Sequence, residues 1–364
     1  MLPGGGKEYV GMKKFAVFSG FLGSGKTTAM MALTRYLNEH GSGAAMISND
    51  LGEGVTLADH RLAELSGCRA SQITDECICF CHDVLTELLK TRFDEGCELV
   101  ISDIPGFGVG ALEHVYHGLS REYPDFCELA PFTVVIEPRT AALLREGKSD
   151  DLASIWTAQL LEADLIVLSK CDLLDGDARA ELLAWLGERF PQAQVLPLSA
   201  LGGDGLDALA SALLQGRASL RHPDIDYDDE RLQDAMGSLS EYYLQYHAAV
   251  CCYDFDGNAY LADMAGEIQA AIRAAGCEIP HLKLLAWEPE GDFGKVDLIG
   301  AERPPEIGHC FRGPCTELAV VVNASAACPA ELLDKLAAEA VRAVSDKYQL
   351  ELLLFKRECF GMGD

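Results

Sequence analysis

The chain has 364 residues, of which 49% are hydrophobic and 24% charged, and its formal net charge is −28. This length and composition predict about two packed domains, and the negative charge excludes nucleic acid as an expected partner because phosphates would be repelled. There is no apolar leader and no apolar run long enough to span a membrane, so fourteen cysteines predict free or metal-bound thiols in a reducing cytoplasm.

Strand and helix patterns alternate from Lys14 to about Gly216. We predict strands at 15–18, 44–48, 98–102, 132–136, 164–168 and 194–198, and helices at 28–36, 83–93, 139–146, 150–162, 178–189 and 205–214. Continuous apolar strands that alternate with helices are typical of a mostly parallel sheet with helices on both faces. We therefore expect an α/β domain over residues 14–216, with a flexible tail over residues 1–13.

The pattern changes after Gly216. Residues 217–238 are acidic and lack a clear period, which predicts a linker or an exposed arm. Beyond it we predict strands at 244–252, 281–287, 294–299, 317–323 and 349–355, and helices at 260–275 and 329–346. This order is typical of a smaller α+β domain with an antiparallel sheet over residues 239–364.

A complete phosphate-binding loop, Gly-Phe-Leu-Gly-Ser-Gly-Lys-Thr, lies between the first strand and the first helix. Its glycines let backbone N–H groups turn toward phosphates, and the helix N-terminus adds partial positive charge. Lys26 is expected to reach the β- and γ-phosphates, and the Thr27 hydroxyl is expected to bind Mg²⁺. The predicted contacts of this loop with the nucleotide come from Gly23, Ser24, Gly25, Lys26, Thr27 and Thr28.

Two further segments follow strands in the order that a nucleotide switch requires. Asp103-Ile104-Pro105-Gly106 places a carboxylate where it can support Mg²⁺ and places the Gly106 N–H at the γ-phosphate. Residues 106–110 can then rearrange when that phosphate leaves.

The base-recognition pattern is Ser169-Lys170-Cys171-Asp172, at the end of the strand at 164–168. The Asp172 carboxylate can accept hydrogen bonds from guanine, and adenine lacks that donor pair. The alkyl stem of Lys170 is expected to lie along the base. One unit later, Ser199 and Ala200 follow the strand at 194–198, where the Ala200 N–H can donate to guanine O6.

Together these segments resemble the CobW-like P-loop GTPases, a metallochaperone family that includes the HypB and UreG proteins. The matching text is GFLGSGKTT, ISDIPG, LSKCD and PLSAL, and Asn49-Asp50-Leu51-Gly52-Glu53 resembles the N-E-x-G-E switch segment of the family. The resemblance covers roughly residues 14–216. It implies a GTPase that uses Mg²⁺ and handles a metal. Asp50 and Glu53 are candidates for positioning water, beside the catalytic candidates Lys26, Thr27 and Asp103.

Cysteines gather at Cys77-Ile78-Cys79-Phe80-Cys81. In an extended segment all three thiols project to one face, and thiolates favour Zn²⁺ or another transition metal such as Co or Ni. The alternative is that they are small buried hydrophobic residues. The family carries C-x-C-C here, so the resemblance extends to Cys77 and Cys79, and to Cys81 by analogy.

Other metal ligands remain open. Glu76, His82, Asp50 and Glu53 are possible additions to the thiols. His114 and His117, on the helix expected after residues 106–110, form either a metal pair or part of an exposed face.

The leading hypothesis is a slow GTP-hydrolysing switch that delivers a metal or a corrinoid-type cofactor. Its partner would be a metalloprotein or corrinoid-protein client, and a homodimer is possible. The alternative is a GTP-sensing regulatory module that docks a corrinoid or redox partner and holds no metal. A third possibility is an ATP-driven enzyme of the same fold.

Overall fold

The computed structural model describes residues 13–55, 58–148, 151–250, 253–300 and 302–363. All of the predicted tail except Lys13 lies outside the described residues. Cys251 and Cys252, at the end of a predicted strand, also lie outside them, and so does Thr56. Within these described ranges, no helix combines the length and the apolar character needed to cross a membrane.

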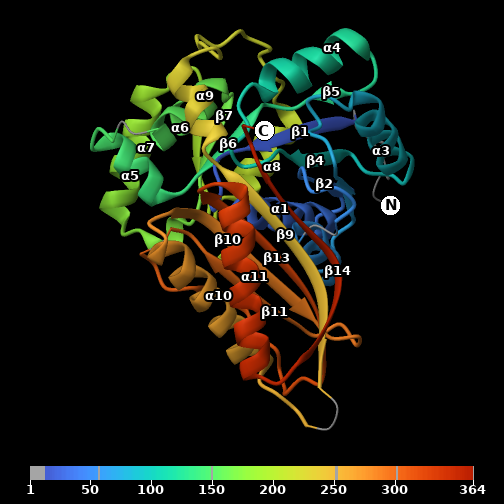
Figure 1. Cartoon of the computed structure of the whole chain (residues 1–364). Coiled ribbons are helices and arrows are strands. Elements are labelled where there is room, and N and C mark those ends of the chain that lie inside the picture. The colour runs from blue at the N-terminus through green and yellow to red at the C-terminus, as the bar shows by residue number, and fades with distance from the viewer. Residues whose placement is uncertain (1–12, 56–57, 149–150, 251–252, 301, 364) are drawn as a thin grey trace, which may run out of the picture.

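A parallel sheet forms the first half of the molecule, as the sequence predicts (Figure 1). Its strand order is β3-β2-β4-β1-β6-β7-β8, and the short β5 pairs with β1. The strands are β1 (Lys14–Ser19), β2 (Ala44–Asn49), β3 (Ala70–Ile73), β4 (Leu99–Asp103), β5 (Glu128–Leu129), β6 (Thr133–Ile136), β7 (Leu165–Leu168) and β8 (Gln194–Pro197). Since the strands are parallel, their carboxyl ends meet at one edge, where ligands bind in such sheets.

Helices cover both faces of this sheet. They are α1 (Lys26–Glu39), α2 (Ala58–Leu65), α3 (His82–Asp94), the π-helix η1 (Leu112–His117), α4 (Gly118–Glu122), α5 (Pro138–Arg145), α6 (Asp151–Glu162), the 3₁₀ turn η2 (Cys171–Leu173), α7 (Gly176–Arg189) and α8 (Leu206–Gln215). Side chains along β1 alternate between the two faces of the sheet. Phe15 and Val17 pack with residues of α3, η1 and α7, whereas Ala16 and Phe18 pack with residues of α1 and α8.

The predicted linker is partly a packed helix, which corrects the sequence-based expectation. Helix α9 (Glu230–Gly237) begins at Asp229, whose carboxylate accepts a hydrogen bond from the Leu232 N–H at 3.0 Å. Its few apolar residues, Leu232 and Ala235, are buried with Phe107 and Trp156. Most of the acidic residues that suggest an exposed arm precede this helix, which docks on α6.

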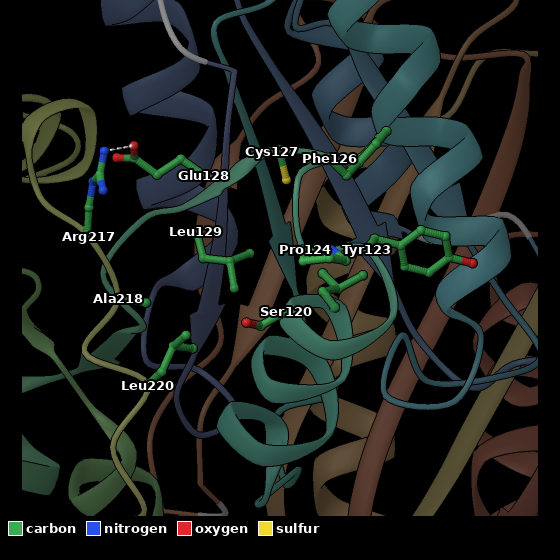
Figure 2. Close-up of a pocket in the computed structure, with 11 residues that line it drawn as sticks. Ser120, Tyr123, Pro124, Phe126, Cys127, Glu128, Leu129, Arg217, Ala218 and Leu220 are labelled. Atoms are coloured by element: carbon green, nitrogen blue, oxygen red, sulfur yellow. Dashed lines mark ion pairs between the residues drawn. The ribbon is translucent and has the colours of Figure 1, made fainter.

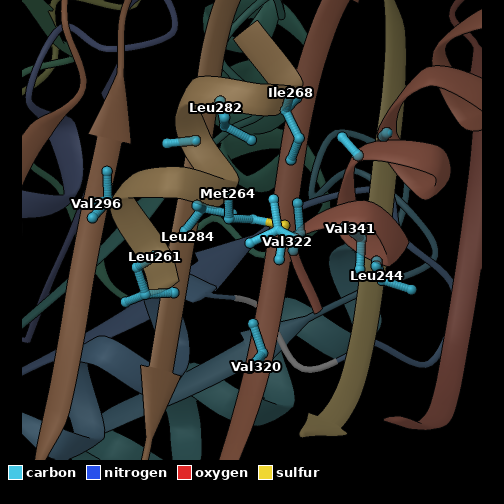
Figure 3. Close-up of a cluster of buried hydrophobic side chains, with 14 of the residues drawn as sticks. Leu244, Leu261, Met264, Ile268, Leu282, Leu284, Val296, Val320, Val322 and Val341 are labelled. Atoms are coloured by element: carbon cyan, nitrogen blue, oxygen red, sulfur yellow. The ribbon is translucent and has the colours of Figure 1, made fainter. Parts of the chain in front are cut away.

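An antiparallel sheet of order β12-β11-β10-β13-β9-β14 forms the second half. Its elements are β9 (Ser240–Ala249), α10 (Gly257–Ala274), β10 (Glu278–Trp287), β11 (Phe293–Leu298), β12 (Glu306–His309), β13 (Glu317–Ala327), α11 (Ala330–Lys347) and β14 (Glu351–Gly361). Helices α10 and α11 bury one face of the sheet, and Figure 3 shows Leu261, Met264 and Ile268 of α10 over Leu284 and Val322 of the strands. The sequence predicts all of these elements except β12.

The opposite face of the second sheet packs against the first half of the molecule. Leu285 and Val321 are paired neighbours on β10 and β13, and both are buried in the cluster that contains residues of α1 and α2. Side chains alternate along a strand, so Lys283, two positions before Leu285, points toward the first half as well. This packing brings strand residues of the second sheet to the predicted nucleotide site.

Candidate functional site

The predicted nucleotide residues gather at the carboxyl edge of the parallel sheet. The phosphate loop follows β1, Asp103 ends β4, Ser169 follows β7, and Ser199 follows β8. Strand order and connection thus bring together segments that are far apart in the sequence.

The phosphate loop has a backbone that requires glycine. Gly20 has a φ of 128°, and a Cβ there would lie 2.1 Å from the Val135 carbonyl oxygen. Gly25, with a φ of 94°, immediately precedes helix α1. Lys26 is buried, and its ammonium donates hydrogen bonds to the carbonyl oxygens of Gly20 at 2.5 Å and Phe21 at 3.3 Å. Burial lowers the pKa of Lys26 to about 8.

The base-recognition segment contacts the phosphate loop directly. The Ser169 hydroxyl donates to the Ser24 carbonyl oxygen at 2.6 Å, and the Lys170 ammonium donates to the Gly23 carbonyl oxygen at 3.0 Å. The Ser199 hydroxyl donates to the Asp172 carboxylate at 2.7 Å. The predicted segments at 169–172 and 199–200 therefore meet, with the Asp172 side chain exposed beside them.

Asp103 lies at the end of β4 and is almost fully buried. Its carboxylate accepts a hydrogen bond from the Asn49 N–H at 2.8 Å. Burial, together with the negative charge of Asp59, raises the pKa of Asp103 to about 7. Gly106, three residues later, packs so closely on the phosphate loop that a Cβ would lie 2.6 Å from the Leu22 side chain.

Asp59 and Lys283 belong to this site, although no motif identifies them. The Lys283 ammonium lies 2.5 Å from the Asp59 carboxylate, and Asp59 also accepts a hydrogen bond from the Thr27 side chain. Burial opposes ionisation of Asp59, but the charge of Lys283 prevails and lowers the pKa of Asp59 to about 2. The sequence signal for this pair is a single lysine, Lys283, within the apolar run of β10.

The switch candidates Asp50 and Glu53 are also held by the second sheet. The Tyr243 hydroxyl donates to the Asp50 carboxylate at 2.5 Å, and the Glu53 N–H donates to the Glu358 carboxylate at 2.8 Å. Burial raises the pKa of Asp50. The segment predicted to respond to nucleotide is therefore anchored across the contact between the two halves.

The cysteine segment is a turn, so the expected extended conformation is wrong. The Cys77 and Cys79 sulfur atoms lie 3.1 Å apart, but Cys81 precedes α3 and its thiol donates to the Cys77 carbonyl oxygen at 3.4 Å. Ile78, between the two cysteines in sequence, is fully buried. In the described part of the chain, the three sulfurs do not form a compact cluster of three ligands.

Cys77 is the thiol best suited to metal binding in this turn. The hydrogen bond between the Cys77 and Cys79 thiols lowers the pKa of Cys77, whereas the same bond and then burial raise the pKa of Cys79. Burial raises the pKa of Cys81 to about 11. Since the thiolate is the metal-binding form, a cation would meet a ready ligand at Cys77 with Cys79 adjacent.

Asn49 connects the thiol turn to the nucleotide site. Its side-chain amide donates to the Glu76 carbonyl oxygen at 2.9 Å, and its side-chain oxygen accepts from the Ile78 N–H at 3.0 Å. Its own backbone N–H donates to Asp103. One buried residue thus touches both the expected magnesium carboxylate and the turn that carries Cys77 and Cys79.

His82, a possible extra thiol-site ligand, is directed elsewhere. Its Nδ1 lies 2.9 Å from the Glu122 carboxylate, and its ring packs against Gly118 at the start of α4.

A cavity of about 260 Å³ lies at the opposite edge of the sheet (Figure 2). Figure 2 shows Arg217 paired with Glu128, at 2.7 Å, beside Leu129. Since Glu128 pairs with Lys14 at the amino end of β1, this cavity is separate from the nucleotide edge.

Comparison with known proteins agrees with the motif analysis. Residues 14–197 match the family model described as CobW/HypB/UreG, nucleotide-binding domain. Among curated relatives, the zinc chaperone YeiR of Escherichia coli is 28% identical over 193 residues, which cover 51% of this chain and 55% of that protein. The GTPase Obg of Akkermansia muciniphila is 31% identical over 131 residues, or 34% of this chain and 35% of that protein. The chain thus spans about half or less of these relatives.

Solved structures include HypB from Helicobacter pylori in complex with nickel, with 19% identity, a TM-score of 0.40, and coverage of 57% of this chain and 89% of that one. Zn(II)-bound YjiA GTPase from E. coli has 16% identity, a TM-score of 0.36, and coverage of 91% and 99%. The family model covers just over half of the sequence and includes the phosphate loop, Asp103 and the segment at 169–172. This chain therefore belongs to the CobW/HypB/UreG family through its nucleotide-binding domain.

Proposed function

We propose that the protein is a GTP-hydrolysing switch whose nucleotide state controls metal binding at Cys77 and Cys79. The observation that carries this proposal is the position of Asn49, which hydrogen-bonds both Asp103 and the thiol turn. Any movement of Asp103 toward a Mg²⁺ ion would be passed to the turn through one residue, from its backbone N–H to its side chain. The similarity to a zinc chaperone supports metal delivery as the purpose of the switch.

The nucleotide roles follow from the geometry. The loop N–H groups and Lys26 would hold the phosphates, and Thr27 and Asp103 would hold Mg²⁺. Asp172 and Ala200 would recognise guanine. Binding of GTP would not require an arginine from a partner protein. Intrinsic GTP hydrolysis should be slow, about 10⁻⁴–10⁻² s⁻¹, as in unaided GTPases.

GTP and Mg²⁺ would have to displace contacts made by the second sheet. Lys283 is the positive charge beside Thr27 and Asp59, where the magnesium ion is expected, and Ile299 packs against Gly23. Binding of the nucleotide would therefore loosen the contact between the two halves and shift the segment from Asn49 to Glu53. Hydrolysis would restore the contact.

The cargo is proposed to be Zn²⁺ or another transition metal such as Ni or Co, since thiolates favour these ions. The recipient would be a metalloprotein client in the cytoplasm. A corrinoid protein is proposed as an alternative client, and a homodimer is proposed as the assembly.

The test measures Zn²⁺ affinity of the full chain in the GTP-bound and GDP-bound forms under anaerobic conditions. We expect the two affinities to differ by at least about fivefold, the low end of ordinary coupling energies. Asn49→Ala should leave GTP binding intact and abolish this difference, because the side-chain hydrogen bonds to the thiol turn are lost while the backbone N–H that contacts Asp103 remains. Cys77→Ser with Cys79→Ser should remove the site itself.

A matched control is Asn38→Ala. Asn38 also bridges two backbone groups through its side chain, accepting from the Ala44 N–H at 2.9 Å and donating to the Ala44 carbonyl oxygen at 3.1 Å. Its loss should cost similar stability without uncoupling metal from nucleotide. Equal Zn²⁺ affinities in both nucleotide states of the unmodified protein would rule out the switch. A metal-free protein that still binds a partner with GTP would favour the regulatory-module alternative.

A further inference from the structure

A short acidic segment, residues 217–229, crosses the outside of the first domain at a fixed position. The Arg221 guanidinium donates to the carbonyl oxygens of Leu161 and Ala163, the latter at 3.0 Å. The Tyr227 hydroxyl donates to the Glu162 carboxylate at 3.2 Å. Both anchors hold the segment against the end of α6, so His222 between them has a defined neighbourhood.

His222 meets two residues of the π-helix η1. Its Nδ1 lies 3.2 Å from a Glu113 carboxylate oxygen, and His117 Nε2 lies 3.8 Å from the same oxygen. The two imidazole rings stack, with centroids 4.5 Å apart. One ligand atom from each of the three residues lies within 4.8 Å of the others, so small side-chain rotations would direct all three at one ion.

We propose that Glu113, His117 and His222 form a second transition-metal site, separate from the cysteines. Two imidazoles and a carboxylate are a donor set for Zn²⁺, whereas Mg²⁺ prefers oxygen ligands alone. Three protein ligands leave a fourth position for water. The site is partly open to solvent because His222 is 77% exposed, so the bound ion would exchange readily rather than serve as a permanent structural centre.

The position of this site gives the ion a physical consequence. Helix η1 follows the loop from Gly106 to Gly110, and π-helical turns occur frequently at functional sites. A bound ion would fasten the segment around His222 to this helix. It would thereby limit movement of the helix when the loop rearranges. The site requires no thiol and no nucleotide, so it extends beyond the switch proposed above and does not depend on it.

The sequence alone presents only part of this cluster. It suggests His114 and His117 as a pair, but the structure places His114 beside Gly110, with its ring 5.7 Å from that of Phe80. The partner of His117 is instead His222, which is more than one hundred residues away in the chain. Only the folding of the acidic segment over η1 reveals the three-residue set.

The test uses the full chain with Cys77, Cys79 and Cys81 replaced by serine, without nucleotide. Zn²⁺ titration by calorimetry should reveal a site whose affinity falls at least about tenfold in a further His222→Ala variant, since even indirect ligand support is worth 10–100-fold. His222 is exposed, so this change should not affect folding. Glu113→Gln, which keeps the shape of the side chain, should weaken binding in the same direction.

The matched control is His247→Ala. His247 also faces a carboxylate, Glu317, at 3.6 Å on a partly exposed surface, but it belongs to no three-ligand cluster in the described residues. Co²⁺ used as a probe should show visible absorption that His222→Ala removes, without the near-ultraviolet charge transfer of thiolate ligation. Identical Zn²⁺ titrations for the His222→Ala and His247→Ala variants would overturn the proposal, whatever the outcome for GTP-dependent coupling.

Discussion

At the scale of single residues, Asp172 is the residue proposed to select the purine base. It is exposed at the edge of the sheet and receives a hydrogen bond from Ser199 on one oxygen. That bond holds one carboxylate oxygen, and the second has no hydrogen-bond partner among the described residues. The proposal assigns this second oxygen to the N–H donors of a guanine.

Replacement of Asp172 by alanine should remove most of the preference for GTP over ATP. Loss of one hydrogen-bonding group that reads a ligand is worth roughly 1–3 kcal/mol, so a drop of about tenfold to a hundredfold is expected. Asp175→Ala is the matched control: Asp175 caps α7 through the Ala178 N–H at 2.8 Å and touches no part of the base site. Competition binding with both nucleotides measures the ratio, and an unchanged ratio in the Asp172 variant would refute the assignment.

At the scale of elements, the sequence predicts what periodicity and motif position determine. Six strands of the parallel sheet and most of the helices between them are recovered, as is the position of the segments at 103–106 and 169–172, because parallel strands carry their ligands at their carboxyl ends. Elements β3, β5 and α2 are absent from the predicted elements. The helix expected after residues 106–110 is found at Leu112–Glu122, and its first half is π-helical rather than α-helical. The expectation for the cysteine segment was wrong because a Cys-x-Cys-x-Cys spacing fits two structures. It fits an extended strand with alternating side chains, and it also fits a turn that Asn49 stabilises.

The junction of α6, η1 and the acidic segment contains a buried acid. Glu162 is fully buried, and burial raises the pKa of Glu162 to about 8. One carboxylate oxygen accepts from the Leu112 N–H at 3.3 Å and from Tyr227, while the other has no hydrogen-bond partner among the described residues. The folded protein thus keeps a proton on Glu162 at neutral pH that the unfolded chain, with a carboxyl pKa of about 4.3, releases.

This proton makes stability depend on pH in a defined direction. Between about pH 4 and pH 8 the folded state binds more protons at Glu162 than the unfolded state, so its contribution to stability falls as pH rises. Glu162→Gln mimics the protonated acid and should flatten this dependence. We expect the variant to lose about 1–3 kcal/mol less free energy of unfolding than the unmodified protein between pH 5 and pH 8. Denaturant titrations at both pH values measure this, and parallel curves would contradict it.

At the scale of the whole molecule, the second sheet contacts the predicted nucleotide site. Helices α10 and α11 cover one face of that sheet, and its other face presents Lys283, Tyr243 and Leu285 to the first domain. No sequence motif encodes this contact, because the lysine acquires its meaning only from the fold that sets it beside Asp59. Domain packing and nucleotide occupancy are therefore expected to be linked.

Lys283→Met tests that link. Without nucleotide the change leaves the Asp59 carboxylate largely buried without its cation, which should cost about 3 kcal/mol of stability. With saturating Mg²⁺ and GTP the loss should shrink, because the magnesium ion at Thr27 would supply positive charge beside Asp59. Lys347→Met is the control, since Lys347 pairs at 2.6 Å with Asp263 on the helices that cover the other face of the second sheet, and its loss should not depend on nucleotide. Adding Asp59→Asn to Lys283→Met should recover stability in the nucleotide-free form. Thermal unfolding with and without nucleotide decides the matter: an equal loss in both conditions would mean that Lys283 merely joins two domains and has no part in sensing the magnesium ion.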